Sequence, residues 1–159
     1  MHQVLPIQYE DRKPIISMGI RLFSDHMSPP ELGPFIRHMV DWNISVKLVV
    51  DGKLAGFYLL NKHSICDYAE EVLYWEEDMN TYKDKSAIQG VGLGLWPEYR
   101  GQGYGKLLRA IPLAMDVDYV WGQHFKGLNN LHLWEKAGRR LVGASEDAYF
   151  TLIDLDRQR

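Results

Sequence analysis

The chain has 159 residues, which is about the size of one domain, and a formal net charge of −3 with its histidines neutral. Hydrophobic residues make up 46% and charged residues 25%, a globular composition that argues against disorder, collagen or a coiled coil. The single cysteine, Cys66, excludes an intrachain disulfide and a multi-cysteine zinc site. We therefore expect one domain over residues 1–159, with no bound metal.

Charge and hydropathy also bear on partners and location. A net negative charge gives no global basic field that would attract nucleic acid. The longest apolar runs, such as Phe57–Leu60, are far too short to cross a bilayer, and the N-terminus has no basic segment followed by an apolar one. These features predict a cytoplasmic protein that binds neither nucleic acid nor a membrane.

The predicted elements begin with a short strand at residues 3–7. Apolar residues at helical spacing predict a helix over Asp11–Phe23. The segment Ser28–Glu31 predicts the start of a second helix, with Ser28 as its N-cap, and this helix should end near Trp42.

The hydrophobic period then changes to that of strands. Residues 44–50 and 54–60 are predicted strands, and Asp51-Gly52 between them is a strong signal for a two-residue hairpin turn. The stretch Asp67–Asp78 is acidic and fits either a helix or a strand. Residues 88–96 form a third long predicted strand.

The C-terminal part alternates helices and strands. Helices are predicted over residues 103–111 and 129–137, with a short strand at Tyr119–Gly122 between them, and closing strands follow at 141–144 and 148–155. This order predicts an α+β domain, or an α/β domain with a mixed sheet.

The segment Arg100–Lys106 carries the clearest chemical signal, because it follows a predicted strand and opens a predicted helix. Its three glycines allow positive φ and leave backbone N–H groups unobstructed at the positive end of a helix dipole. Arg100, Lys106 and Arg109 add positive charge. This geometry suits a phosphate or pyrophosphate; the alternative is a glycine-rich turn that merely packs tightly.

Two other phosphate-binding motifs fail on spacing. A P-loop requires glycine where this chain has Arg100, and Ser or Thr where it has Leu107. A dinucleotide-binding fingerprint requires a third glycine where this chain has Lys106.

The pattern R/Q-x-x-G-x-G/A, present as Arg100, Gly103 and Gly105, resembles the acetyl-coenzyme-A loop of the GNAT superfamily of N-acetyltransferases. The resemblance extends from about Ile88 to Gly138 and includes Leu133–Gly138, similar to the family's L-Y-E-K-x-G stretch. It implies a mostly antiparallel central sheet with a splayed pair of parallel strands, flanked by about four helices. The residues it implies for binding acetyl-CoA are Leu93, Leu95, Arg100, Gly101, Gln102, Gly103, Tyr104, Gly105, Lys106 and Asn129.

The resemblance also implies an activity. We expect transfer of an acetyl group from acetyl-CoA to a primary amine, on a small molecule or a protein, by direct attack in a ternary complex. The alternative is a catalytically inactive acyl-CoA-binding or regulatory module. Either form could be a monomer or a homodimer.

Three glycines, Gly90, Gly92 and Gly94, alternate along the strand before the loop, so one face of that strand is bare backbone. Such a face marks close approach either by a ligand or by another packed element. We leave both interpretations open at this point.

The catalytic groups are harder to assign. The position of the family's frequent glutamate, eleven residues before Arg100, holds Gln89, and the position of its frequent tyrosine acid holds Trp134. Neither side chain titrates near neutral pH. His124, just after the predicted strand Tyr119–Gly122, becomes our candidate base, titrating near the usual histidine pKa of about 6.5; the alternative is a solvated loop histidine. Asn129 could equally be a helix N-cap, without a ligand.

Overall fold

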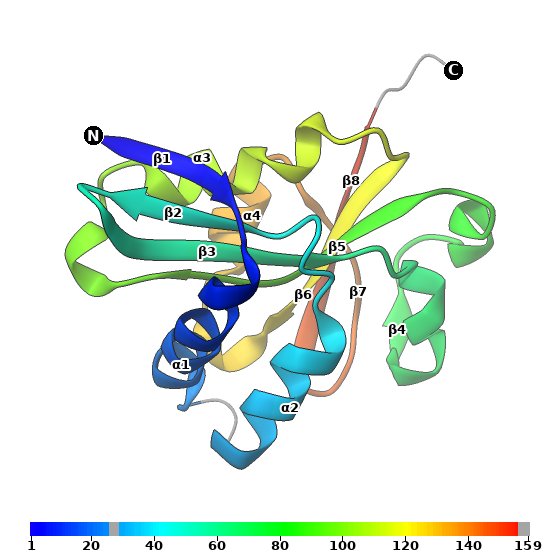
Figure 1. Cartoon of the computed structure of the whole chain (residues 1–159). Coiled ribbons are helices and arrows are strands. Elements are labelled where there is room, and N and C mark those ends of the chain that lie inside the picture. Colours follow the sequence, from blue (N-terminus) through cyan, green and yellow to red (C-terminus); the bar gives the residue numbers. More distant parts are fainter. Residues whose placement is uncertain (26–28, 156–159) are drawn as a thin grey trace. The chain divides into compact units, whose positions relative to one another are not determined.

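Eight strands form one mixed sheet in the computed structural model, which describes residues 1–25 and 29–155 (Figure 1). Their order across the sheet is β1-β2-β3-β5-β6-β8-β7-β4. The strands are β1 (His2–Pro6), β2 (Val46–Val50), β3 (Lys53–Asn61), β4 (Tyr74–Trp75), β5 (Ala87–Leu95), β6 (Tyr119–Phe125), β7 (Arg140–Ala144) and β8 (Ala148–Asp154). The α-helices are α1 (Arg12–Phe23), α2 (Pro29–Met39), α3 (Tyr104–Ala110) and α4 (Leu131–Lys136).

The structure therefore confirms the predicted α+β class, with a mixed sheet whose β5 and β6 run parallel. The residues group into two compact units that share β5. Unit 1 holds Met1–Asn61 and Val91–Arg109, and unit 2 holds Lys62–Gly90 and the chain from Ala110 onward. A single domain over residues 1–159 stays a prediction.

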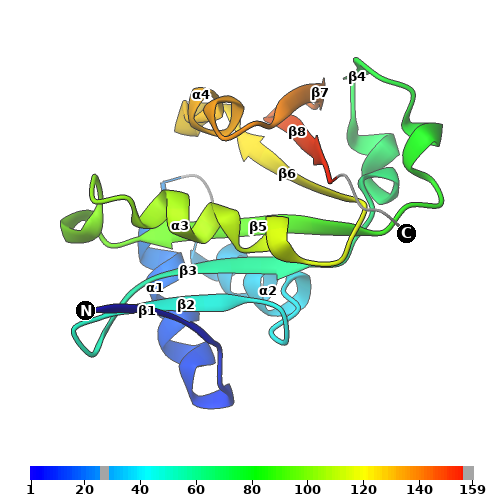
Figure 2. The same ribbon diagram turned by 90° about the horizontal axis from the view of Figure 1, so that it is seen from above.

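Unit 1 is built on the antiparallel strands β1, β2 and β3, which lie side by side (Figure 2). The apolar stripe predicted for the first helix forms its core, where Ile15 and Met18 of α1 and Ile36 of α2 pack against Phe57. The predicted two-residue turn at Asp51-Gly52 has positive φ at both residues, 50° and 78°, as a type I′ hairpin turn requires.

The second helix begins at Pro29, so the predicted cap Ser28 lies outside the described residues. It ends at Met39 and not near Trp42, because the chain turns at Asp41. The Asp41 carboxylate accepts a hydrogen bond from the Asn43 N–H at 3.1 Å, and the Asp41 carbonyl accepts one from the Ile44 N–H at 3.3 Å.

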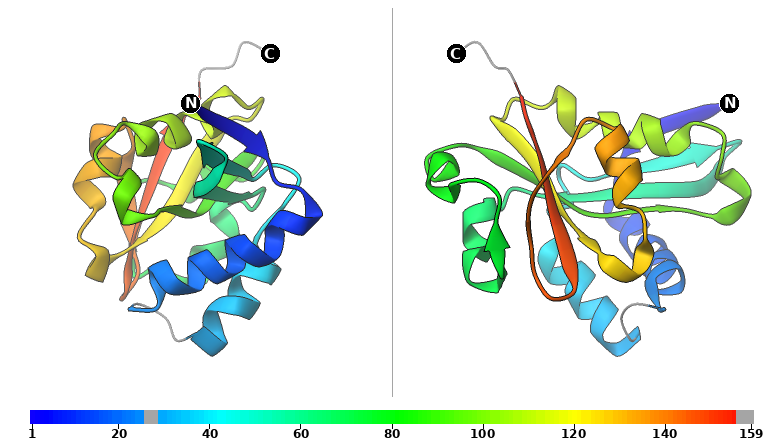
Figure 3. Two further views of the ribbon diagram at one scale, coloured as in Figure 1. Left: turned by 60° about the vertical axis from the view of Figure 1, so that its left-hand side comes forward. Right: turned by 180° about the vertical axis from the view of Figure 1, so that it is seen from behind.

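Unit 2 is built on β6, β8 and β7, in which the central strand β8 is antiparallel to both neighbours, and α4 packs beside β7 and β8 (Figure 3). Its core is aromatic, with Tyr119, Trp121 and Phe150 fully buried. The predicted strand Tyr119–Gly122 is three residues too short, because the pairing of β6 with β8 continues to Phe125.

The segment between β3 and β5, which includes the ambiguous stretch Asp67–Asp78, contains two 3-10 helices, η2 (Ile65–Glu71) and η3 (Met79–Tyr82), separated by the two-residue strand β4. Ser64 caps η2, since its hydroxyl accepts a hydrogen bond from the Cys66 N–H at 3.1 Å. The thiol of Cys66 donates to the Met79 carbonyl at 3.3 Å, which agrees with a structural cysteine. A short 3-10 helix has three residues per turn, so it lacks the 3.6-residue period by which an amphipathic α-helix is recognised. The spacing of apolar residues therefore could not predict these two helices.

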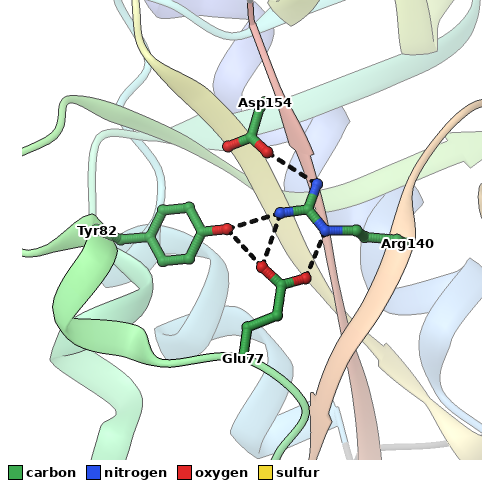
Figure 4. Close-up of polar contacts among 4 residues, drawn as sticks. All are labelled: Glu77, Tyr82, Arg140 and Asp154. Carbon is green, nitrogen blue, oxygen red and sulfur yellow. Dashed lines mark hydrogen bonds and ion pairs between the residues drawn. The ribbon is translucent and has the colours of Figure 1, made fainter.

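A polar cluster of four residues, Glu77, Tyr82, Arg140 and Asp154, joins this segment to β7 and β8 (Figure 4). The Arg140 guanidinium donates to both carboxylate oxygens of Glu77, one of them at 2.8 Å, and lies 2.9 Å from the Asp154 carboxylate. The Tyr82 hydroxyl donates to Glu77 at 2.8 Å. The hydrogen bonds from Arg140 lower the pKa of Glu77, despite some burial, and the Tyr82 bond lowers it further.

Replacing Glu77 by glutamine is expected to lower the free energy of unfolding at pH 7 by about 1 kcal/mol. Hydrogen bonds to charged groups contribute about 1.5–3 kcal/mol, and the partial exposure of this pair reduces that. Because the folded pKa is lowered, this stabilisation is present above the pKa of an unfolded glutamate and is lost as the pH falls through the folded value. Urea unfolding from pH 7 to pH 3 measures it, with the exposed neighbour Glu76→Gln as the control. Equal stability of the two variants at pH 7 would contradict the assignment.

Candidate functional site

The loop before α3 takes its shape from two glycines with positive φ, Gly101 at 74° and Gly103 at 88°. An added Cβ at either position would meet no atom within 4 Å. Tight packing is therefore not the reason for these glycines; the backbone conformation is. The first N–H groups of α3 follow directly, and a helix leaves such groups without an intrahelical partner.

Two side chains brace this loop from outside. The Arg100 guanidinium donates from Nε to the Leu95 carbonyl at 3.2 Å, and the Gln102 amide donates to the Glu98 carbonyl at 2.8 Å. Both side chains and Lys106 are exposed. The loop thus offers backbone donors and exposed positive charge, which fits an anionic phosphate group.

Gly105 has a different role from Gly101 and Gly103. Its φ is not positive, and an added Cβ would lie 3.2 Å from the Arg109 guanidinium and 3.8 Å from Leu95. A small residue at 105 therefore leaves room for Arg109 beside the first turn of α3. Because that guanidinium is the end of a flexible side chain, it could move aside for a larger residue at position 105. A substitution at Gly103, where φ is positive, therefore tests the loop conformation more directly.

Two of the alternating glycines of β5, Gly92 and Gly94, lie in unit 1 and differ in how closely they are packed. An added Cβ on Gly94 would lie 2.6 Å from Phe57 and 2.8 Å from Leu22, while one on Gly92 would lie 3.6 Å from Phe23. These neighbours belong to β3 and α1, so close packing explains the glycine at position 94, whereas the contact at position 92 is an ordinary van der Waals distance. Leu93 and Leu95, which alternate with the glycines, are half-buried.

The parallel ladder between β5 and β6 covers only part of each strand. It runs from Ala87 opposite Tyr119 to Gly90 opposite Gly122 and ends there. Beyond this point β6 continues to Phe125 in register with β8. The backbone of residues 123–125 of β6 therefore pairs with β8 on one edge but lies outside the β5–β6 pairing on the other edge.

His124 lies in this last part of β6 and is 6% exposed, so it is neither a loop residue nor solvated. Its Nε2 lies 2.6 Å from the Thr151 hydroxyl. Burial, together with the nearby charge of Arg139, lowers the pKa of His124 to about 3. This value differs from the expected titration near 6.5, because the imidazole is buried and not solvated. The assignment of His124 as the catalytic base stays a prediction.

We expect the imidazole of His124 to remain neutral in the folded protein down to about pH 3. The unfolded state takes up a proton near pH 6.5, so His124 contributes stability above that pH and loses it at about 1.4 kcal/mol per pH unit below it. NMR titration of the histidine ring signals measures the folded value. A His124 signal that titrates between pH 5 and 8 would contradict this account, and the exposed His132 provides an internal comparison.

Comparison with known proteins identifies the architecture. No protein-family model and no curated protein sequence matches the chain. Solved structures do match. A putative arylalkylamine N-acetyltransferase 7 from the yellow fever mosquito is 13% identical, with a TM-score of 0.74 over 98% of this chain and 88% of the other.

Two further solved structures have the same fold. PaiA N-acetyltransferase from Thermoplasma acidophilum, solved with coenzyme A, is 13% identical, with a TM-score of 0.65 over 97% of this chain and 99% of the other. A GNAT-family acetyltransferase from Listeria monocytogenes is 15% identical, with a TM-score of 0.64 over 97% and 95%. The chain has the GNAT N-acetyltransferase fold.

In this GNAT fold Trp134 is a packing residue. It is 9% exposed, its ring lies 4.8 Å from that of His124, and the Arg139 guanidinium lies 4.4 Å from the ring centre. The indole has no proton that it can donate to a leaving thiolate near neutral pH. At the position where the GNAT superfamily frequently has a tyrosine, this chain thus has an aromatic residue that packs α4 against His124 of β6.

Asn129 is not the N-cap of the last helix. It follows a short 3-10 turn with φ of 50°, in the left-handed region that asparagine tolerates, and its N–H donates to the Lys126 carbonyl at 3.2 Å. The cap position of α4 falls on Asn130, whose side chain makes no capping bond. Within the described part of the chain, Asn130 Oδ1 is buried without a hydrogen-bond partner.

Sequence reasoning missed one cluster altogether. His63, Tyr68 and Gln89 come together in unit 2, with the Tyr68 hydroxyl 3.3 Å from His63 Nδ1 and 3.2 Å from Gln89 Oε1. Tyr68 was not a candidate because the segment around it carries no readable period.

Within residues 1–25 and 29–155, no three or more His, Cys, Asp or Glu side chains gather as a metal site would require. No helix of this part combines the length and the apolar character needed to pass through a membrane.

Proposed function

We propose that this protein transfers an acetyl group from acetyl-CoA to a primary amine. The observation that carries the proposal is the loop Arg100–Lys106: two positive-φ glycines with open space around them, exposed cations, and the start of α3. A loop of this conformation suits the pyrophosphate of a coenzyme A. The GNAT fold and the coenzyme-bound PaiA structure support the same choice of cosubstrate.

In this proposal the backbone N–H groups of the loop and of α3 hold the pyrophosphate, and Arg100 and Lys106 add Coulomb attraction. Main-chain groups of Leu93 and Leu95 bind the pantetheine arm, and Asn129 contacts the coenzyme. Acetyl-CoA supplies an activated thioester when bound. The amine nitrogen attacks the carbonyl carbon, the C–N bond forms, the C–S bond breaks, nitrogen loses a proton and the thiolate gains one.

Direct attack in a ternary complex is preferred over an acyl-enzyme. Cys66, the single cysteine, is half-buried and its thiol donates to the Met79 carbonyl. Positioning of the two substrates supplies much of the rate in such a reaction, and backbone N–H groups can stabilise the developing oxyanion.

The second candidate is a catalytically inactive acyl-CoA-binding or regulatory module. It rests on Gln89 and Trp134, because neither can take up or release a proton near neutral pH. Both candidate functions require the same coenzyme site. They differ only in whether the protein transfers the acetyl group to an amine.

A free-thiol release assay with acetyl-CoA and a panel of small amines and N-terminal peptides tests the proposal. Thiol release that depends on the amine, with the acetylated product identified by mass spectrometry, is the expected result. Coenzyme A binding in calorimetry without amine-dependent release would favour the inactive module. No binding of coenzyme A would contradict both.

A further inference from the structure

Strand β4 of unit 2 lies at one end of the sheet and exposes two large apolar side chains. In the sheet formed by the described residues, β4 is the last strand and pairs with β7 alone. Leu73, directly before β4, is 74% exposed, and Tyr74 is 45% exposed. The outer edge of such a strand is a ready template for pairing with another chain.

The segment that carries these side chains is held firmly on unit 2. The N–H groups of Leu73 and Glu76 donate to carbonyls of β7 at 2.9 Å and 2.7 Å. The Trp75 ring packs against the buried Phe150 ring at 5.8 Å. An added Cβ on Gly143 would lie 2.7 Å from Trp75, so the glycine lets β4 lie close to β7. A partner would therefore meet a surface that is already ordered, which reduces the entropy cost of binding.

Negative charge is concentrated around β4. Residues 63–82 contain six Asp or Glu residues and no Lys or Arg, whereas the whole chain has a net charge of −3, so the remainder of the chain is net positive. Glu70 and Glu71 precede the exposed apolar pair and Glu76 follows it, and all three side chains are exposed. The apolar pair thus has carboxylates on both sides along the chain.

Three of the six carboxylates already have partners within unit 2. Glu77 is held by Arg140 (Figure 4). Asp67 and Asp78 each accept a hydrogen bond from a main-chain N–H of the same segment, at 3.2 Å and 3.0 Å. The ion pairs of the described residues leave the three exposed glutamates beside the apolar pair without a basic partner.

The chemistry of this surface selects one kind of partner. A metal ion requires converging ligands, and in the described part of the chain no three or more His, Cys, Asp or Glu side chains gather in that way. A second copy of the chain, paired edge to edge, would place like charges opposite one another, and a nucleic acid would repel the carboxylates. An extended segment with basic side chains satisfies both the open strand edge and the charge.

We propose that β4 and the glutamates beside it form a docking site for an extended, basic segment of a partner protein. The segment adds as a strand to the outer edge of β4, and its apolar side chains cover Leu73 and Tyr74. Its Lys or Arg side chains pair with Glu70, Glu71 and Glu76. Main-chain hydrogen bonds supply affinity, and the charges select the partner. The site uses neither coenzyme A nor acetyl transfer, so it is independent of the proposed function.

A hexapeptide of alternating arginine and valine, blocked at both ends and labelled with a fluorophore, is the probe. It offers no primary alkylamine, so it cannot act as an acetyl acceptor. Fluorescence anisotropy should show binding that weakens as the salt concentration rises. The triple variant Glu70→Gln, Glu71→Gln, Glu76→Gln should weaken binding by about tenfold, because each exposed ion pair contributes only a little. Glu135→Gln, an exposed glutamate on α4, is the matched control and should bind as wild type does.

The apolar contact is tested separately. Leu73→Ser should weaken binding of the same peptide by about tenfold, while Leu133→Ser, at an exposed leucine on α4, should not. Both side chains lie at the surface, so we expect both variants to fold, and urea unfolding checks this. Wild-type affinity in the triple glutamine variant or in Leu73→Ser would overturn the docking site.

A second peptide distinguishes strand pairing from charge attraction alone. Replacing each valine of the probe by proline keeps the charge but removes those backbone N–H donors, so binding should weaken by about tenfold. Equal affinity for the two peptides, or no binding of the arginine–valine peptide, would overturn the proposal. Self-association of the protein that disappears in Leu73→Ser would assign the surface to a second copy and would also overturn it. None of these outcomes bears on acetyl transfer, which the thiol-release assay tests.

Discussion

Gly103→Val is expected to weaken coenzyme A binding by about 100-fold or more, which corresponds to about 2.7 kcal/mol. Gly103 has φ of 88°, and a β-branched residue in this region is a genuine outlier, since even an ordinary side chain there costs about 1–2 kcal/mol. The loop would change conformation to relieve this strain, and its N–H groups would no longer converge. The new methyl groups would also occupy the open space around the glycine.

A second glycine provides the control for backbone strain. Gly52, in the turn between β2 and β3, has φ of 78° and an equally open surrounding. Gly52→Val should therefore lower the free energy of unfolding by about as much as Gly103→Val does, while its affinity for coenzyme A stays at the wild-type value. Calorimetry with coenzyme A, together with urea unfolding, measures both quantities. Wild-type affinity in a folded Gly103→Val protein would contradict the assignment of the loop.

Gly94→Val is expected to lower the free energy of unfolding by about 3 kcal/mol, at the upper end of the usual range for overpacking a core. The added Cβ would lie 2.6 Å from Phe57 and 2.8 Å from Leu22, both inside the core of unit 1. Such distances require the ring or the strand to move. Chemical denaturation measures the loss.

Gly92→Ala is the matched control on the same face of β5. Its added Cβ would lie 3.6 Å from Phe23, an ordinary van der Waals contact, so we expect a change below about 1 kcal/mol. Equal losses of unfolding free energy in Gly92→Ala and Gly94→Val would contradict the claim that Gly94 is the more closely packed of the two glycines.

Local sequence patterns were sufficient for the parts of the fold in which one short segment determines its own conformation. Asp51-Gly52 defines a type I′ turn because both residues tolerate positive φ, and α1 follows from a stripe of apolar residues at helical spacing. The loop Arg100–Lys106 belongs to the same class, since Gly101 and Gly103 act through their backbone conformation.

The rest depends on contacts between distant segments, which no local pattern contains. His124 is buried because β6 pairs with β8 as far as Phe125 and because Thr151 and Trp134 surround the imidazole. Tyr68 reaches Gln89 from a segment whose main chain at His63 and Ile65 is hydrogen-bonded to Trp121 and Tyr119 of β6. Neither arrangement could be derived from residue types and spacing alone.

The most direct test of the central claim is a crystal structure with coenzyme A bound. The account predicts that the pyrophosphate accepts hydrogen bonds from the main-chain N–H groups of the loop Arg100–Lys106 and of the first turn of α3. It also predicts that Arg100 or Lys106 approaches the phosphates. A coenzyme bound elsewhere on the protein, with this loop empty, would contradict the proposed function.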